Sequence, residues 1–488
     1  MNRPGKRSES TLAPATRELL RSLPAATELL SAPELASIHS AVGHGELLIM
    51  IQMATDRLRQ EILAGKIDLD PTTVRNACVE TIQAAHRENL RRRLGPVINA
   101  TGILLHTNLG RSPLAAKVLE RMSQVGGYAN VELDLASGRR SGRGERATEL
   151  LARLTGAEAA LVVNNCAAAT MLALAATSTG RETIISRSQL VEIGGGFRLP
   201  DVFAASGTQL KEVGTTNRTY QHDYQRAIGE TTGAILRVHR SNFSLEGFVA
   251  EPTIEGLMQL DTPEDVAIID DVGSGCLYDL SGLGLTEPNA KESVAAGADL
   301  VLFSGDKLFG GPQAGIVVGK SRWVDTLRAH PMMRAMRVDK STLAGIEATC
   351  EIHLSGRHRE ELPLYTMMYR SQDQLRERAE FLCNRLSAES PLQAKAVQRQ
   401  CAIGGGTLPG FTLPSWCVSI RSQSKSTTEL ARALRIGAPA VQGRVQEDQL
   451  LCDMRSILDG QFEELFDALC AAECHRKTDS QGLLDASH

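Results

Sequence analysis

Seven short apolar segments, most of them separated by a helix-length stretch, constrain the fold of this chain more than any other feature. They lie at about residues 158–163, 182–186, 209–213, 233–238, 266–270, 299–303 and 315–318. Strands that alternate with helix-length segments typically form a parallel sheet covered by helices. The sequence therefore predicts an α/β fold with a mostly parallel, doubly wound central sheet.

The flanking segments differ from this central pattern. Residues 1–92 show helical periodicity without a convincing strand, which predicts a small helical N-terminal domain. Residues 93–340 contain the predicted strands and the glycine-rich turns, and we expect them to form the large domain. Residues 341–488 begin with a long helical stretch and continue with later strands, which indicates a small α+β C-terminal domain.

Composition argues against several classes of protein. No run approaches the ~20 apolar residues of a membrane span, and the N-terminus lacks a signal-peptide core, so we expect a cytoplasmic protein that does not bind membranes. The 10 cysteines are scattered without zinc-finger spacing, which indicates free thiols and no metal site. The net charge of −4 argues against general nucleic-acid affinity, and we expect no DNA binding.

Lys307 follows one of the apolar segments and precedes a glycine-rich turn. Glycines at 305, 310, 311 and 315 indicate close backbone approach rather than a solvated loop. In such a partly desolvated place the pKa of an ammonium group falls and the amine becomes nucleophilic. We therefore expect Lys307 to form a Schiff base, with pyridoxal phosphate as the obvious electrophile. The alternative is an ordinary surface lysine.

An acidic pair ends another apolar segment, at Asp270 and Asp271, just before a Gly/Ser turn. A pyridoxal phosphate enzyme needs a carboxylate against the pyridine nitrogen, which keeps the ring protonated. Either aspartate can supply it, and we favour Asp271 because it lies nearer the turn. The alternative is an aspartate that only caps the turn.

A phosphate site is predicted where Asn165, Cys166 and Ala167 follow an apolar segment and open a helix of small residues. Backbone N–H groups at a helix start bind anions, and small side chains let a phosphate approach closely. We expect Ser304 to be a further phosphate ligand. Any strand-to-helix turn of an α/β protein has a similar pattern, so the prediction depends on its combination with Lys307 and Asp271.

Arginines occur in several short motifs. Guanidinium groups bind phosphates bidentately, so arginines near Lys307 suggest a phosphorylated co-substrate or an RNA backbone. The candidates are Arg111, Arg334 and Arg337. A second cluster, Arg91, Arg92 and Arg93, ends the helical N-terminal domain and predicts a local RNA-binding patch. The alternatives are surface salt bridges and a solvated helix end.

As a set, these motifs resemble the bacterial selenocysteine synthases, the L-seryl-tRNA(Sec) selenium transferases. The matching segments are residues 98–111, 132–143, 186–202, 213–218, 239–243, 271–275, 304–315 and 334–340. The resemblance implies a fold-type-I pyridoxal phosphate enzyme. It also implies conversion of L-seryl-tRNA(Sec) to L-selenocysteinyl-tRNA(Sec) with selenophosphate as donor, through a cofactor-bound dehydroalanyl intermediate.

The chemistry of individual residues is consistent with this reaction. The displaced amine of Lys307 can take the α-proton of the seryl group, and we expect Asp306, beside it, to orient the lysine or handle protons for the departing hydroxyl. We expect the phosphate of the donor to lie among Arg111, Arg334 and Arg337. The family's assembly is a ring of dimers with active sites at subunit interfaces, which implies a homo-oligomer, by family resemblance a homodecamer.

Two other functions fit part of the pattern. A pyridoxal phosphate lyase or desulfurase of free amino acids needs the same lysine and aspartate motifs, but it has no use for the first ~90 residues as a tRNA-binding domain. A non-catalytic RNA-binding paralogue has no use for Lys307.

Overall fold

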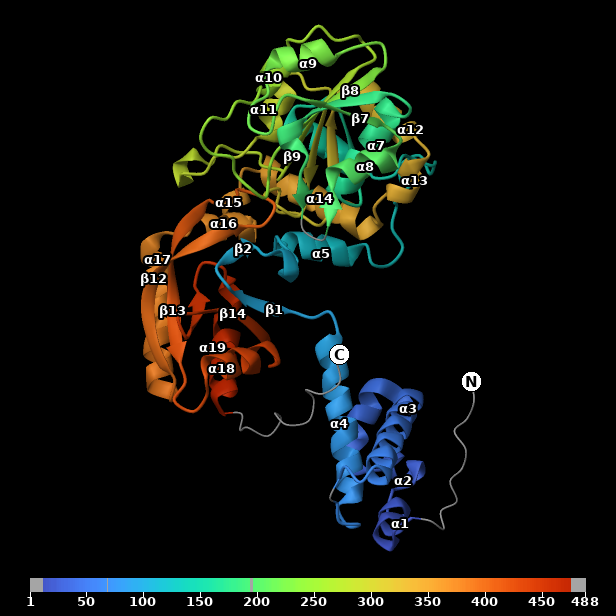
Figure 1. Cartoon of the computed structure of the whole chain (residues 1–488), viewed down its shortest axis with the longest axis vertical. Helices are drawn as coiled ribbons and strands as arrows, with labels where there is room; N and C mark the ends of the chain where they lie inside the picture. Colours follow the sequence, from blue (N-terminus) through green and yellow to red (C-terminus); the bar gives the residue numbers. More distant parts are fainter. Residues whose placement is uncertain (1–11, 68, 194–195, 475–488) are drawn as a thin grey trace. The chain divides into compact units, whose positions relative to one another are not determined.

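The computed structural model of the protein describes residues 12–67, 69–193 and 196–474. The chain forms two compact units, and the boundary between them falls between Pro96 and Val97 (Figure 1). Each unit has its own core, and each is described here by itself.

The N-terminal unit is helical. Its elements are α1 (Pro14–Arg21), α2 (Ala26–Leu30), the short 3-10 helix η2 (Pro33–Leu35), α3 (Ala36–Leu63) and α4 (Val74–Arg92). Buried side chains of α3 such as Leu47 and Ile51 share one core with Cys78 and Ile82 of α4. Apolar residues at helical spacing on α3 and α4 therefore stabilise this unit without a strand.

The central sheet of the second unit has seven strands. They are β3 (Ala159–Val163), β4 (Glu182–Ser186), β7 (Gln209–Val213), β8 (Thr232–Val238), β9 (Ala267–Gly273), β10 (Leu300–Ser304) and β11 (Gly315–Gly319). Their order in the sheet is β3-β11-β10-β9-β8-β4-β7, and β11 is antiparallel to both of its neighbours, whereas the other pairs are parallel. The mostly parallel sheet predicted from the sequence is confirmed.

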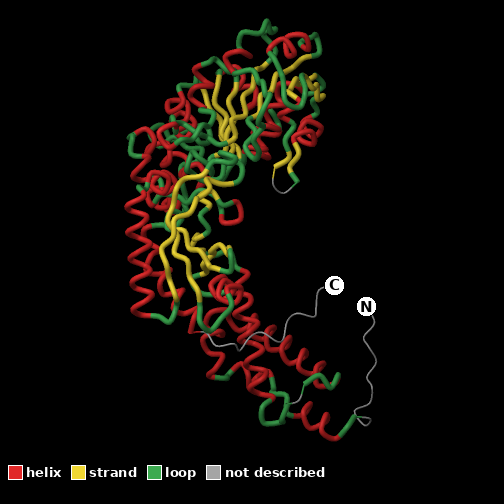
Figure 2. Tube along the Cα trace, turned by 60° about the vertical axis from the view of Figure 1, so that its left-hand side comes forward, coloured by secondary structure: helices red, strands yellow, loops and turns green. Residues whose placement is uncertain are grey.

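Helices cover both faces of this sheet (Figures 1 and 2). Within β10, Val301 and Phe303 belong to one core, and Leu300 and Leu302 belong to the core on the opposite face. This alternation is what a strand buried on both faces requires. The helices of this region are α5 (Ala116–Gln124), α6 (Glu145–Thr155), α7 (Cys166–Ser178), α8 (Leu199–Ser206), α9 (Gln221–Ala227), α10 (Ile254–Leu257), α11 (Ala290–Ala295), α12 (Ser321–Ala329) and α13 (Met332–Met336). A two-stranded ribbon, β5 (Glu192–Ile193) and β6 (Phe197–Arg198), precedes α8.

The C-terminal part has a second sheet and further helices. The strands are β12 (Gln393–Gly404), β13 (Thr412–Arg421), β14 (Ala440–Gln446) and β15 (Gln449–Asp453). The helices are α14 (Lys340–Leu354), α15 (His358–Glu361), α16 (Pro363–Tyr369), α17 (Gln372–Glu389), α18 (Thr427–Arg435) and α19 (Phe462–Cys474). Although nearly all of α14 lies in the segment predicted as the C-terminal domain, its Leu343, Ile346 and Cys350 pack into a core of the central sheet.

The structure corrects the place of the segment that follows Pro96. We expected it in the large domain, but β1 (Val97–Ala100) pairs with β14 and β2 (Ile103–Leu105) pairs with β12, at opposite ends of the strand order β1-β14-β15-β13-β12-β2. Five strand spacings in a flat sheet are roughly 24 Å, whereas the three peptide units from Ala100 to Ile103 reach at most ~11 Å. The sheet must therefore curl, so that its two edge strands, β1 and β2, come close enough to be joined by the short segment between Ala100 and Ile103.

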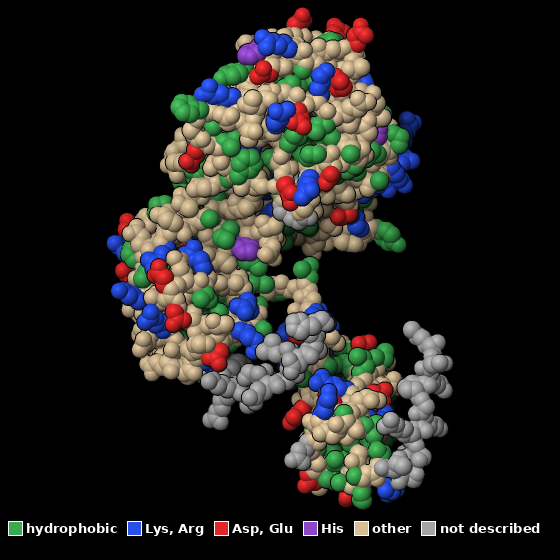
Figure 3. All heavy atoms as spheres, viewed as in Figure 1, with side chains coloured by type: hydrophobic (Ala, Val, Ile, Leu, Met, Phe, Trp, Pro, Cys, Tyr) green, Lys and Arg blue, Asp and Glu red, His purple; other side chains and the backbone are tan. Residues whose placement is uncertain are grey.

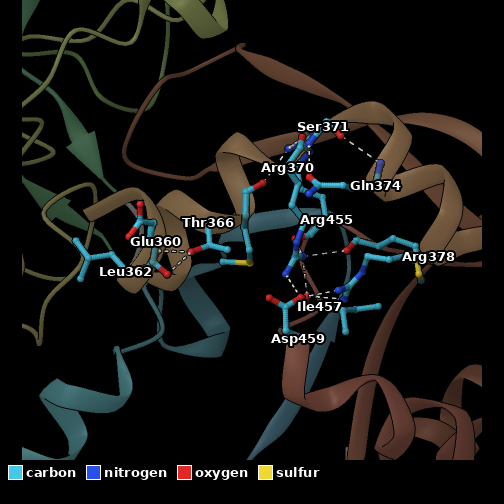
Figure 4. Close-up of polar contacts among 12 residues, drawn as sticks. Glu360, Leu362, Thr366, Arg370, Ser371, Gln374, Arg378, Arg455, Ile457 and Asp459 are labelled. Carbon is cyan, nitrogen blue, oxygen red and sulfur yellow. Dashed lines mark hydrogen bonds and ion pairs between the residues drawn. The ribbon is translucent and has the colours of Figure 1, made fainter. Parts of the chain in front are cut away.

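Two buried arginines fasten the loop after β15 to the helices α16 and α17 (Figure 4). The guanidinium of Arg455 donates hydrogen bonds to the carbonyl oxygens of Met367, Met368, Arg370 and Pro414. Arg370 donates in return to carbonyl oxygens of the loop, including Arg455 O at 3.1 Å, and pairs with Asp459 at 2.5 Å. Each arginine thus satisfies the carbonyl groups of the other's segment, which orders the chain end of α16.

Among the helices that the structure describes, none is both long enough and apolar enough to span a membrane.

Candidate active site

A cavity of about 350 Å³ opens beside the carboxyl ends of β8, β9 and β10. Ligands of open α/β sheets bind at this edge because the loops there leave a crevice. Eight residues that the sequence predicts as site residues line the cavity: Arg111, Asn165, Cys166, Ala167, Asp271, Ser304, Asp306 and Lys307. Four separate segments of the sequence therefore meet in one place.

Lys307 lies in a short turn after β10, and only 6% of its surface is exposed. Its Nζ atom donates a hydrogen bond to the carbonyl oxygen of Gly406, at 2.7 Å. Burial lowers the pKa of this amine below its ordinary value. The turn is held by a hydrogen bond from Leu308 N to Ser274 O, in the loop that follows Asp271. The amine is thus buried, fixed and inclined to be neutral and nucleophilic.

Asp270 and Asp271 point to opposite faces of the sheet, as neighbours in a strand must. Asp270 pairs with Arg237 at 2.9 Å and accepts a hydrogen bond from Ser293, away from the cavity. Asp271 lines the cavity and accepts hydrogen bonds from Thr170 Oγ1 at 3.0 Å and Cys166 Sγ at 3.7 Å. Burial raises the pKa of Asp271 to about 6. The geometry therefore favours Asp271 over Asp270 as the carboxylate that faces a ligand.

The helix α7 begins at the cavity. The side chain of Asn165 caps it by accepting a hydrogen bond from Ala168 N, at 2.9 Å. The strand β11 approaches this turn so closely that a Cβ atom on Gly315 would lie 2.1 Å from Asn165 O. Small residues at 166, 167 and 315 thus leave the N-terminal N–H groups of α7 accessible to an anion.

Asp306, next to the lysine, forms an ion pair with Arg111 at 3.0 Å. Arg111 has a left-handed backbone, with φ 61°, and its segment is tied to the lysine turn by a hydrogen bond from Ser112 N to Asp306 O. Arg111 therefore lies in the Lys307 cavity, but its guanidinium already has a carboxylate partner.

The donor groups of the cavity fit pyridoxal phosphate. The cofactor needs an amine for its aldehyde, a carboxylate for its pyridine nitrogen and an anion site for its phosphate. Lys307, Asp271 and the start of α7 supply these three groups in one cavity. Burial raises the pKa of Asp271 because the charged carboxylate is poorly solvated there. A cationic partner such as a pyridinium would stabilise this charge.

Arg334 and Arg337 line a second cavity of about 650 Å³, together with Arg143, Arg328 and His330. The backbone of Arg337 pairs with Val163 at the end of β3, close to Asn165. Its guanidinium, however, lies 3.7 Å from Glu132, a residue that also pairs with Arg143. Within one chain, these two arginines and Arg111 therefore line different cavities.

The predicted RNA-binding cluster ends α4. Arg91 and Arg92 both pair with Glu88, at 3.8 and 3.1 Å, and Arg93 follows at the exposed end of the helix. On the visible face of the molecule, Figure 3 shows basic and acidic side chains interspersed. The cluster is accessible, and Glu88 neutralises part of its charge.

Several residues of the site escaped sequence reasoning. His239 and Ser241 line the Lys307 cavity, and Glu287 lies behind His239. His353 and Tyr365 hold the turn after Lys307, because His353 Nε2 bonds to Phe309 O at 2.8 Å and Tyr365 Oη donates to Leu308 O at 2.9 Å. Burial lowers the pKa of His353 to about 4, so the ring is neutral. For His239 and Ser241 there were two usable signals: their position after an apolar segment, and the matching segment 239–243, although neither residue was predicted as a site residue.

The sequence model of the L-seryl-tRNA selenium transferase family matches residues 97–458. The chain belongs to this family. A relative from Moorella thermoacetica named L-seryl-tRNA(Sec) selenium transferase is 44% identical over 463 residues, which are 94% of this chain and 97% of the relative. A relative of the same name from Carboxydothermus hydrogenoformans is 40% identical over 454 residues, 92% of this chain and 97% of the relative.

The fold has a counterpart among solved structures. The structure of D-glucosaminate-6-phosphate ammonia-lyase superposes with a TM-score of 0.56 at 22% identity, over 80% of this chain and 98% of that chain. The likeness concerns the fold alone. The fold-type-I class that the sequence predicts is confirmed.

Proposed function

We propose that this protein is a pyridoxal-phosphate-dependent L-seryl-tRNA(Sec) selenium transferase, which converts L-seryl-tRNA(Sec) to L-selenocysteinyl-tRNA(Sec) with selenophosphate as donor. One observation carries the proposal. In a chain of this family, a single cavity brings together the buried amine of Lys307, the carboxyl group of Asp271 and the anion-binding start of α7.

The cofactor is held by residues of this cavity. Lys307 binds its aldehyde, Asp271 faces its pyridine nitrogen, and Asn165, Cys166 and Ala167 hold its phosphate. Ser304, buried beside Lys307, is a further phosphate ligand. When bound, pyridoxal phosphate makes the α-proton of the seryl group acidic, so that the β-hydroxyl can leave and selenium can take its place.

The protein's own groups then handle protons and charge. The amine of Lys307 is positioned to accept and return the α-proton, and burial lowers its pKa, which favours the form that can accept a proton. Asp306 orients the lysine turn through its ion pair with Arg111. The hydrogen bonds of His353 and Tyr365 to the next two carbonyl groups keep this turn rigid.

The selenophosphate donor is bound by Arg111, Arg334 and Arg337. Because these arginines line two cavities of one chain, the complete donor site belongs to an assembly in which a second copy of the chain brings them together. This requirement supports a homo-oligomer built from dimers, a ring of five dimers by family resemblance. Mixing Lys307→Ala subunits with Arg334→Ala subunits should then restore activity that neither variant has alone.

The helical N-terminal unit binds the tRNA, with Arg91, Arg92 and Arg93 on its phosphates. A filter-binding titration of the full chain and of residues 95–488 at two salt concentrations tests this role. We expect steep loss of seryl-tRNA(Sec) binding on deletion, and weaker binding of the full chain at high salt. Equal binding by both proteins would refute the role.

The function is tested with purified protein, seryl-tRNA(Sec) and radioactive selenophosphate. We expect a yellow protein that absorbs at about 410–430 nm and transfers selenium, and a Lys307→Ala variant that does neither. Free serine is the competing substrate. A protein that releases pyruvate from free serine but leaves seryl-tRNA(Sec) unchanged would instead be an amino-acid lyase.

A further inference from the structure

His239 is a cavity residue to which the proposed function assigns no role. It directly follows β8, its backbone N–H donates to Asp271 O at 2.9 Å, and the residue lines the cavity that contains Lys307. In the sheet, the preceding residue Val238 lies opposite Asp271. The imidazole is therefore at the same edge of the sheet as the groups that the proposed function uses.

The buried carboxylate of Glu287 lies next to the imidazole of His239. Glu287 has a side chain that is 1% exposed, and its Oε2 atom lies 3.4 Å from His239 Nε2, without the geometry of a hydrogen bond. Its other oxygen, Oε1, accepts a hydrogen bond from Thr407 Oγ1 at 3.0 Å. Thr407 is fully buried and follows Gly406, whose carbonyl oxygen binds Lys307. One short segment thus fixes both the lysine and the carboxylate.

The carboxylate of Glu287 faces the imidazole of His239 from a buried position. A buried carboxylate is costly unless a cation or several donors compensate it. Within residues 12–67, 69–193 and 196–474, the one ion pair of Glu287 is with His239. An imidazole between a ligand cavity and a buried carboxylate has the arrangement of an acid–base group and its orienting partner.

Asp306, the other candidate for proton transfer to the hydroxyl, is committed elsewhere. Its Oδ2 atom forms an ion pair with Arg111 at 3.0 Å, so this carboxylate already serves as the partner of a guanidinium. Of the residues that line the cavity, His239 is the histidine, the residue type that most often serves as a general acid.

We propose that His239 is a further catalytic residue, which donates a proton to the departing hydroxyl of the seryl group, and that Glu287 positions it. The proposal rests on the proposed function. As the Cα–H bond breaks, its proton passes to the amine of Lys307 and its electron pair forms the second Cα–Cβ bond. The Cβ–O bond breaks with its electron pair on oxygen, the His239 proton joins that oxygen, and water leaves with neutral imidazole behind.

The experiment separates the two proton transfers. Cofactor-loaded wild-type and His239→Asn proteins are incubated with seryl-tRNA(Sec) in D₂O without donor, the serine is recovered by hydrolysis, and deuterium at Cα is measured by mass spectrometry. Selenium transfer is measured in parallel with selenophosphate, and cofactor binding by absorbance. For His239→Asn we expect full cofactor binding, α-exchange within about threefold of wild type and selenium transfer reduced by about 10²–10⁴-fold.

Three further variants sharpen the result. Glu287→Gln keeps an acceptor for Thr407 but removes the charge, and it should reduce selenium transfer while sparing α-exchange. Imidazole in the buffer should partly rescue His239→Gly. His222→Asn, in an exposed His–Asp pair at the same distance of 3.4 Å, is the matched control and should behave as wild type.

The outcomes distinguish the inference from the proposed function. If wild-type protein neither exchanges the α-proton nor transfers selenium, the proposed function fails and the inference fails with it. If wild type is active and His239→Asn retains selenium transfer, the inference alone is overturned. Equal loss of exchange, transfer and cofactor absorbance in His239→Asn would make the residue a structural part of the cofactor site, which also overturns it.

Discussion

Replacement of Asp271 by asparagine should make the cofactor-free protein more stable and the enzyme inactive. Burial raises the pKa of Asp271 from 3.8 to about 6. Between these two values the folded protein binds more protons than the unfolded chain, so the stability contributed by this group falls as the pH rises. Above pH 6 the cost stays constant, and a shift of this size corresponds to about 3 kcal/mol.

Asparagine removes this cost because it carries no charge, and its carbonyl oxygen can still accept the hydrogen bond of Thr170. For Asp271→Asn we expect a free energy of unfolding that is higher than that of wild type by about 3 kcal/mol at pH 7, and by roughly half as much at pH 5. Urea denaturation of both cofactor-free proteins between pH 5 and 8 measures the difference. Cofactor affinity should fall, because the pyridinium loses its counter-ion.

The neighbouring aspartate provides the control. Asp270→Asn removes the partner of Arg237, whose side chain is only 18% exposed, and it should destabilise the protein by about 3–5 kcal/mol. The two identical substitutions at adjacent positions should thus have opposite signs. A cofactor-free Asp271→Asn protein that is less stable than wild type at pH 7, or a difference that does not shrink toward pH 5, would refute this reasoning.

Other substitutions test the packing around the site. Gly144→Ala should lower the free energy of unfolding in two ways: by ~1–2 kcal/mol because alanine disfavours the left-handed backbone, and by about 1–3 kcal/mol because its Cβ would lie 2.6 Å from Leu343. Gly138 has a similar φ but open space around it, so Gly138→Ala should show only the first effect in urea denaturation. Tyr365→Phe should lower the free energy of unfolding by about 1–3 kcal/mol, because the buried carbonyl group of Leu308 loses its hydrogen-bond donor. Hydrogen exchange in the turn that contains Lys307 should become faster. Arg455→Met leaves four carbonyl groups without their hydrogen-bond donor and should lower the free energy of unfolding by at least about 3 kcal/mol, which is measured as a lower Tm. An unchanged Tm would contradict the role of the arginine.

Much of the large domain could be predicted from the sequence because its signals are local. Buried parallel strands are near-continuous apolar runs, and the seven segments found in this way are the seven strands of the central sheet. The lysine, the aspartate and the capped helix were visible for a related reason, since each directly follows such a run. That the three meet in one cavity follows from parallel strands ending at one edge.

The remaining features depend on contacts between distant segments. The sequence near Val97 and Ile103 does not indicate that these strands pair with β14 and β12, because the residues of a single strand do not specify which distant strand it pairs with. Glu287 lies in a loop without a periodic pattern, and only the folded chain places it against His239. The choice between Asp270 and Asp271 also required the structure, since the sequence does not show which face of β9 borders the cavity.

The curled C-terminal sheet has a consequence for the order in which the chain folds. Residues 97–105 leave the ribosome early, but their partners β12 and β14 begin only at Gln393 and Ala440. Until then the segment has unpaired backbone groups on strands of high apolar content, a state that is prone to aggregate. The last strands synthesised thus complete a sheet begun by the first, and pairing over such a separation is slow. A fragment that ends after the central sheet would contain Lys307 but lack its partner Gly406, and residues 97–105 would have no strand to pair with. Such fragments should therefore be found in aggregates rather than as active enzyme.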